Sequence, residues 1–100
     1  MRKIAARSYE GRPDETVTVW ATASENAALR FRLDGRDIQA PSPLKFRITE
    51  ARHMSIALVG ETGARCRVTI EPVDESSDFD IFVSTRHDPF PVQHYGFRVA

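Results

Sequence analysis

The sequence predicts an all-β protein: an antiparallel β-sandwich of immunoglobulin-like or jelly-roll type with seven or eight short strands. Three observations predict this class. Apolar and polar residues alternate with a period of two through most of the chain, helical spacing is nearly absent, and turn-forming residues recur about every ten residues. A chain of 100 residues buries roughly 60–70 % of its unfolded surface, which is enough for one core. We therefore expect residues 1–100 to form a single domain.

The first half of the chain contains four alternating segments. The stretch Glu10–Asp14 contains glycine and proline and indicates a turn, and Asp34–Gly35 is a strong hairpin signal. Proline lacks the amide that a central strand needs, so Gln39–Pro43 marks a break. Ser24–Leu29 has the composition of a single helical turn. The expected strands are Lys3–Tyr9, Thr16–Ala23, Leu29–Leu33 and Leu44–Thr49.

The second half continues the same pattern. A Gly60–Gly63 turn separates two of its strands, and Pro89 and Pro91 break the chain before the last strand. The expected strands are Met54–Leu58, Arg65–Ile70, Phe79–Val83 and Tyr95–Val99. The predicted core consists of apolar residues in one phase of the strands, namely Phe31, Leu33, Phe46, Ile48, Ile56, Leu58, Val68, Ile70, Ile81 and Val83.

Composition and charge narrow the classes of partner. The formal net charge is zero, which gives no reason to expect nucleic acid or an anionic membrane. The single cysteine, Cys66, excludes an intrachain disulfide, and its phase with Val68 and Ile70 predicts a buried, inert thiol. The chain shows neither the apolar stretch of a signal peptide nor a run long enough to cross a membrane. We expect a cytoplasmic protein, although a processed or leaderless exported protein would share these features.

Charge is nevertheless segregated along the chain. Five carboxylates lie between residues 71 and 80, leaving nine acidic residues against 14 basic ones elsewhere. Calcium takes six to eight hard oxygen ligands, and a bent loop can supply several of them. The spacing is not that of an EF-hand, so the alternative is a solvated hairpin tip. The candidate calcium ligands are Asp74, Glu75, Asp78 and Asp80, and no other cofactor is indicated.

One part of this region resembles a known family. The segment Ser77–Val83 reads Ser-Asp-Phe-Asp-Ile-Phe-Val and resembles the Asp-x-Asp-Leu-Tyr-Val signature of bacterial pre-peptidase C-terminal domains. Those domains are small β-sandwich modules appended to secreted hydrolases. The likeness extends to Met54–Ile70 and Pro89–Arg98, about 45 residues in all. It implies that Asp78 and Asp80 organise the turn or hold a cation.

A second candidate site is basic. The polar phase of each of three strands carries two cations, and if the strands shared a sheet, six cations would line one face. Such a face is typical of a polyanion or acidic-protein site, and the alternative is an ordinary solvated surface. The six residues are Arg30, Arg32, Lys45, Arg47, Arg65 and Arg67.

Trp20 shares the phase of Thr16, Thr18 and Thr22. If exposed, its indole would offer a platform on which a sugar ring could stack. A lone tryptophan in a small sandwich is more often part of the core, and threonine favours a pleated surface in any case. The sequence leaves both interpretations open.

Catalysis finds little support. No serine lies in a nucleophile-elbow pattern, and Asp78 and Asp80 could form a two-carboxylate hydrolase site only at a hairpin tip without a cleft. The histidines show no paired metal-ligand spacing, and the one candidate cluster is His87, Asp88 and His94. We therefore predict a non-enzymatic β-sandwich module for binding or interaction, with an unassigned partner. The alternative is a carbohydrate- or polyanion-binding protein that uses the basic face or Trp20, and a small hydrolase is third.

Overall fold

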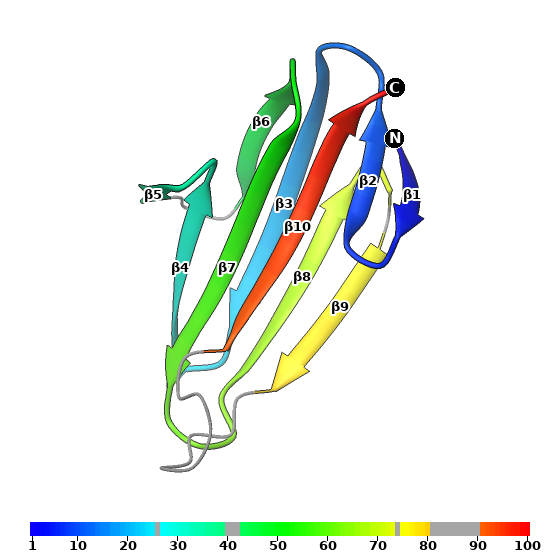
Figure 1. Cartoon of the computed structure of the whole chain (residues 1–100). Helices are drawn as coiled ribbons and strands as arrows, with labels where there is room; N and C mark the ends of the chain where they lie inside the picture. Colours follow the sequence, from blue (N-terminus) through cyan, green and yellow to red (C-terminus); the bar gives the residue numbers. More distant parts are fainter. Residues whose placement is uncertain (26, 40–42, 74, 81–90) are drawn as a thin grey trace.

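The computed structural model describes residues 1–25, 27–39, 43–73, 75–80 and 91–100, with no side-chain description at 75, 77, 78 and 80. These residues form ten strands in two sheets and contain no helix (Figure 1). The all-β prediction is confirmed for this part of the chain. The strands are β1 (Arg2–Ala5), β2 (Ser8–Gly11), β3 (Glu15–Ala23), β4 (Ala27–Leu33), β5 (Arg36–Ile38), β6 (Leu44–Ile48), β7 (Arg52–Gly60), β8 (Arg65–Glu71), β9 (Glu75–Asp80) and β10 (Val92–Val99).

The larger sheet has six strands in the order β1-β2-β10-β7-β4-β5. Its pairs are antiparallel except for β2 and β10, which run parallel with Tyr9 opposite Phe97. The prediction of a purely antiparallel fold is therefore wrong at this pair. Strands β2 and β10 come from opposite ends of the chain, so no hairpin imposes an antiparallel direction on them.

The smaller sheet has four strands in the order β6-β3-β8-β9 and is antiparallel throughout. Its inner face packs against the inner face of the six-stranded sheet, and the buried residues of both form one hydrophobic cluster. Phe46 of β6 meets Phe97 of β10 edge to face, with ring centroids 5.1 Å apart, and Tyr9 stacks on Phe97 at 5.3 Å. One core thus joins the two sheets.

The predicted core is largely confirmed because the period of two correctly separates the two faces of each strand. Leu33 is only partly buried at the core's margin, and residues 81 and 83 lie outside the described part of the chain. The predicted residues that are buried are Phe31, Phe46, Ile48, Ile56, Leu58, Val68 and Ile70.

Three local predictions are wrong. The expected strand Lys3–Tyr9 is a hairpin of β1 and β2, which Arg7 helps to turn with φ at 55°. The segment expected to form a helical turn contains the start of β4, where Ala27 pairs with Gly60 because sheet pairing prevails over local propensity. The acidic segment is not a turn: Glu75–Asp80 is strand β9, paired with β8.

The Asp34–Gly35 hairpin is confirmed. Asp34 has φ at 52° and Gly35 at 82°, which is the pair of positive angles that a type I′ turn requires. The turn is also fixed to β7, because the Asp34 carboxylate accepts hydrogen bonds from the His53 amide at 2.9 Å and from Arg52 Nε at 2.6 Å. This turn joins β4 and β5 as an antiparallel hairpin.

Candidate functional site

The outer face of the four-stranded sheet carries an exposed tryptophan. In β3 the inward phase holds Val17, Val19 and Ala21, which are at most 5 % exposed. Trp20 lies in the other phase and is 44 % exposed. The period of two that buries the aliphatic residues therefore places the indole in solvent, and the more usual interpretation of Trp20 as a core residue is wrong.

The strand register fixes the neighbours of Trp20. On β8 it lies opposite Thr69, and Thr22 lies opposite Arg67. On the other side of β3, Thr18 lies opposite Lys45. Diagonal neighbours in an antiparallel pair are roughly 7–8 Å apart, within reach of long side chains, so a cation lies within reach on either side of the indole. We call this surface the Trp20 face and define it as Thr16, Thr18, Trp20, Thr22, Lys45, Arg47, Arg65, Arg67, Thr69 and Glu71.

A groove lies at one end of the Trp20 face, at the end of β3 and the start of β8. It has a volume of about 420 Å³ and is lined by residues 22–24 and 65–67. The groove mouth is fixed because Ser24 Oγ accepts a hydrogen bond from the Arg65 amide at 3.1 Å, and the Ser24 amide donates to the Arg65 carbonyl at 2.9 Å. Cys66 is 2 % exposed, so the prediction that its thiol is buried is confirmed.

The predicted face of six cations does not exist. Lys45 and Arg47 on β6 and Arg65 and Arg67 on β8 share the four-stranded sheet, whereas Arg30 and Arg32 on β4 belong to the other sheet. The sequence could not reveal which strands share a sheet, because a strand alternates inward and outward residues in the same way in either sheet. Four of the six residues thus lie on the Trp20 face.

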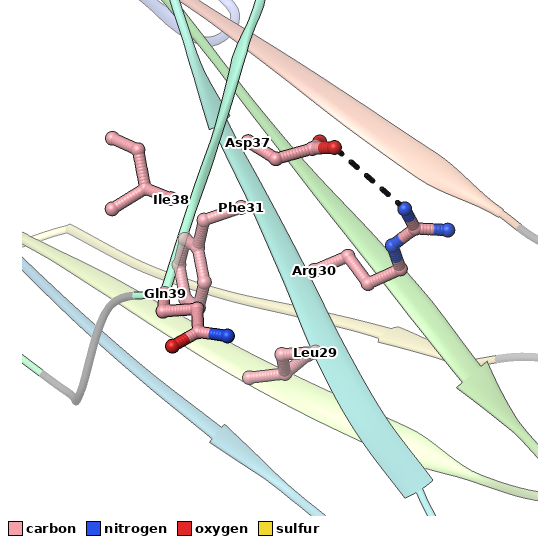
Figure 2. Close-up of a pocket in the computed structure, with 6 residues that line it drawn as sticks. All are labelled: Leu29, Arg30, Phe31, Asp37, Ile38 and Gln39. Carbon is pink, nitrogen blue, oxygen red and sulfur yellow. Dashed lines mark ion pairs between the residues drawn. The ribbon is translucent and has the colours of Figure 1, made fainter.

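The two remaining cations have an acidic partner of their own. Arg32 Nε donates to Asp37 Oδ1 at 2.7 Å, and Arg30 lies 3.9 Å from the same carboxylate. The hydrogen bond from Arg32 lowers the pKa of Asp37 from its ordinary value. Figure 2 shows Arg30 reaching toward Asp37 beside a pocket of about 310 Å³ between β4 and β5. Both arginines are therefore already engaged with Asp37 across the β4–β5 hairpin and are less available to a ligand.

The acidic candidates lie beside the basic ones. The backbone register places Asp78 opposite Arg67 and Asp80 opposite Arg65. Strand β9 pairs with β8 and therefore borders the Trp20 face. Asp74 and the side chains of Glu75, Asp78 and Asp80 lie outside the described part of the structure, and calcium binding there stays a prediction. Among the side chains that the structure describes, no three histidines, cysteines or carboxylates gather to hold a metal.

One contact was missed by the sequence interpretation. His53 of β7 and His94 of β10 lie 41 residues apart in the chain, yet their rings touch with a nitrogen–nitrogen distance of 3.2 Å. No local spacing signals this pair, because it depends on β7 pairing with β10. The other members of the predicted histidine cluster, residues 87 and 88, lie outside the described residues.

Comparisons with known proteins add no relative: no family model, curated protein or solved structure matches this chain. The resemblance to pre-peptidase C-terminal domains therefore stays an expectation from the sequence. Within the described segments, no helix is long and apolar enough to span a membrane.

Proposed function

We propose that the protein is a non-enzymatic β-sandwich module that binds an acidic carbohydrate chain on the Trp20 face. The observation that carries this proposal is the 44 % exposure of Trp20 in the middle of a polar sheet face. Burying a large aromatic ring is favourable, so an indole left in solvent on a regular strand is a candidate contact for a ligand.

The strand order supports an immunoglobulin-like sandwich. The series β10-β7-β4-β5 corresponds to the G, F, C and C′ strands of a variable-type immunoglobulin sheet. Strand β3 beside β6 then corresponds to the neighbouring B and E strands of the other sheet. In this assignment the β8–β9 hairpin is an addition next to strand B, and it forms one border of the Trp20 face.

A sugar ring suits the centre of the face. The apolar C–H face of a pyranose can cover the indole, while Thr18, Thr22 and Thr69 beside it can donate and accept hydrogen bonds with hydroxyl groups. Covering roughly 100 Å² of indole at about 25 cal/mol per Å² would contribute about 2.5 kcal/mol, or somewhat less than a hundredfold in affinity.

Charge favours an acidic sugar over a neutral one. Lys45 and Arg47 are exposed on β6, and Arg67 lies on the opposite side of the indole. A carboxylated or sulfated chain that crosses β3 would meet a cation on both sides of the stacked ring.

A titration with three oligosaccharides tests the proposal. Isothermal calorimetry should detect binding of a heparin oligosaccharide or an oligogalacturonate and weaker binding of the neutral cellohexaose. Trp20→Ala should lower the affinity for the acidic chains about tenfold or more, because the stacking surface is lost. Lys45→Glu/Arg47→Glu should also lower it and should flatten its dependence on salt, since fewer counterions are released on binding.

Arg30→Glu/Arg36→Glu on the other sheet makes the same change in net charge and is the matched control. It should bind as the wild type does. Equal losses in the control and the Lys45→Glu/Arg47→Glu variant, or unchanged binding by Trp20→Ala, would refute the assignment of the Trp20 face. A variant at Arg65 and Arg67 is less informative, because both arginines have interactions within the protein that the substitution would also remove.

A further inference from the structure

The outer face of the six-stranded sheet, on the opposite side of the molecule from the Trp20 face, holds two histidines in contact. In the β7–β10 register His53 lies opposite Gly96, and His94 lies opposite Ser55. The two histidines are therefore diagonal neighbours, and each has a small residue directly opposite it. This leaves room for the rings to lean together, and they stack with centroids 5.1 Å apart and planes inclined by 28°.

The nitrogen atoms of the pair are spaced as two ligands of one metal ion. His94 Nδ1 lies 3.2 Å from His53 Nε2. In a tetrahedral zinc site with Zn–N bonds of 2.0–2.1 Å, two ligand nitrogens are about 3.3–3.4 Å apart. To bind one ion, both rings must rotate so that the lone pairs of His53 Nε2 and His94 Nδ1 point at it. Both side chains are exposed, which leaves room for this rotation.

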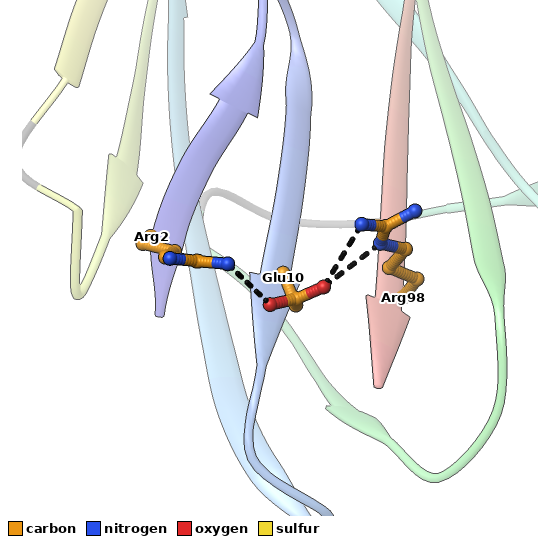
Figure 3. A network of polar contacts seen from close by, with 3 residues as sticks. All are labelled: Arg2, Glu10 and Arg98. Atoms are coloured by element: carbon orange, nitrogen blue, oxygen red, sulfur yellow. Dashed lines mark hydrogen bonds and ion pairs between the residues drawn. The ribbon is translucent and has the colours of Figure 1, made fainter. Parts of the chain in front are cut away.

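The surrounding charges are mostly paired, which reduces the repulsion that a dication would meet. Arg52, next to His53, donates to Asp34 at 2.6 Å, and Arg32 donates to Asp37. Arg98, four residues beyond His94, lies 3.0 Å from Glu10, which also pairs with Arg2 (Figure 3). Arg30 makes only the 3.9 Å contact with Asp37 and is the least neutralised guanidinium near the pair.

Open space adjoins His94 on the side of β4. A groove of about 380 Å³ is lined by Arg30, Arg32, Ser55, Ala57, Val92 and His94. Water or an anionic ligand could occupy it and complete the coordination of an ion bound by the two imidazoles. Arg30 at the groove would favour an anion in that position.

We propose that His53 and His94 form a binding site for a zinc ion, through His53 Nε2 and His94 Nδ1. Each neutral ring would then carry its proton on the nitrogen that does not bind zinc, His53 Nδ1 and His94 Nε2. Two metal–nitrogen bonds would replace the hydrogen bond between the rings. Both imidazoles would stay neutral. Copper(II) and nickel(II) also favour imidazole and should compete, whereas magnesium and calcium prefer oxygen ligands and should not bind here. With two protein ligands, the site should be much weaker than a four-ligand structural zinc site.

Zinc titration of the metal-free protein, followed by calorimetry and by NMR of the imidazole nitrogens, tests the proposal. The expected result is saturable binding of one zinc ion, with shifts at His53 Nε2 and His94 Nδ1 and no response to magnesium or calcium. His53→Gln and His94→Gln should each weaken zinc binding by at least about tenfold, as expected when a ligand is removed. The matched control is Glu61→Gln, which removes an exposed carboxylate just beyond the end of β7 that is remote from His53 and should retain the wild-type affinity.

A second measurement uses the wild-type protein alone. Copper(II) or nickel(II) should compete with zinc for the site, and magnesium or calcium should not. Zinc binding that is unchanged in the His53→Gln/His94→Gln double variant would overturn the proposal. So would the absence of saturable binding, or a loss of binding in Glu61→Gln equal to that in the histidine variants.

Discussion

Asp34 links the β4–β5 turn to the neighbouring strand β7. Its backbone has the positive φ of a type I′ turn, and its carboxylate accepts hydrogen bonds from the His53 amide and the Arg52 side chain. Partial burial alone would raise the pKa of Asp34, but those two donors outweigh it and hold the pKa below its ordinary value. A lowered pKa means that the folded state binds the ionised form more strongly than the unfolded state does.

Asp34→Asn should therefore destabilise the protein in a pH-dependent way. Asparagine tolerates the same backbone angle, so the change removes the charge and leaves the turn. The wild type should be more stable by about 0.5–1 kcal/mol near pH 7, a value limited by the solvent exposure of the ion pair. This advantage should disappear as the pH falls through the lowered pKa, because the wild-type carboxylate is then neutral too.

Urea unfolding at pH 7 and at about pH 2.5 measures the difference. Asp37→Asn on the neighbouring strand β5 is the control, since the Asp37 pair with Arg32 is more exposed than the Asp34 pair with Arg52 and should contribute less. A stability difference for Asp34→Asn that persists unchanged at low pH would mean that the carboxylate charge is not its source.

At the scale of the elements, the packing of β2 depends on a glycine. A Cβ atom on Gly11 would lie 2.8 Å from Ile48 Cδ1 of β6, and Ile48 is fully buried. Strand β2 belongs to the six-stranded sheet and β6 to the other, so the backbone of β2 at Gly11 packs closely against a side chain of the opposite sheet. The sequence interpretation assigned Gly11 to a turn, and only the packing explains why β2 ends in a glycine.

Gly11→Ala should lower the free energy of unfolding by about 1–3 kcal/mol, because Ile48 must shift within a packed core. Gly96→Ala in β10 is the matched control, since its Cβ would meet no atom closer than Ser8 Oγ at 3.9 Å. The control should change stability by no more than about 0.5 kcal/mol. Thermal or urea unfolding of both variants makes the comparison, and equal stability of the two would show that β6 accommodates the methyl group.

At the scale of the whole molecule, the two sheets depend on one core. Phe46 from the four-stranded sheet contacts Phe97 from the six-stranded sheet, and Arg52 lies 5.3 Å above the Phe46 ring. The outer faces of the sheets are chemically different: one carries Trp20 among threonines and cations, and the other carries the histidine pair. Each face can therefore be tested separately while the shared core holds both.

Phe46→Ala should lower the free energy of unfolding by about 3–5 kcal/mol, because it removes a buried ring that contacts both sheets. Both sheets should still unfold together, since neither has a core of its own. Trp20 fluorescence reports on the four-stranded sheet, and NMR signals of His53 and His94 report on the other. Separate transitions for the two probes would contradict a single shared core.

The sequence by itself determined the class of fold and most of the core. The period of two separates the faces of a strand, so the buried positions of Phe31, Phe46, Ile56 and Val68 could be predicted without knowing which strands pair. The Asp34–Gly35 turn was predictable for a similar reason, because the backbone angles it needs depend on the local residues alone.

Only the tertiary structure decided which faces are functional candidates. The phase of a strand does not specify its sheet, so the sequence could not separate Arg30 and Arg32 from the cations of β6 and β8. Nor could it show that one phase of β3 leaves Trp20 in solvent, or that β7 and β10 bring His53 against His94. These arrangements depend on pairing between distant segments, which is fixed by the summed burial of the whole core and not by any local pattern.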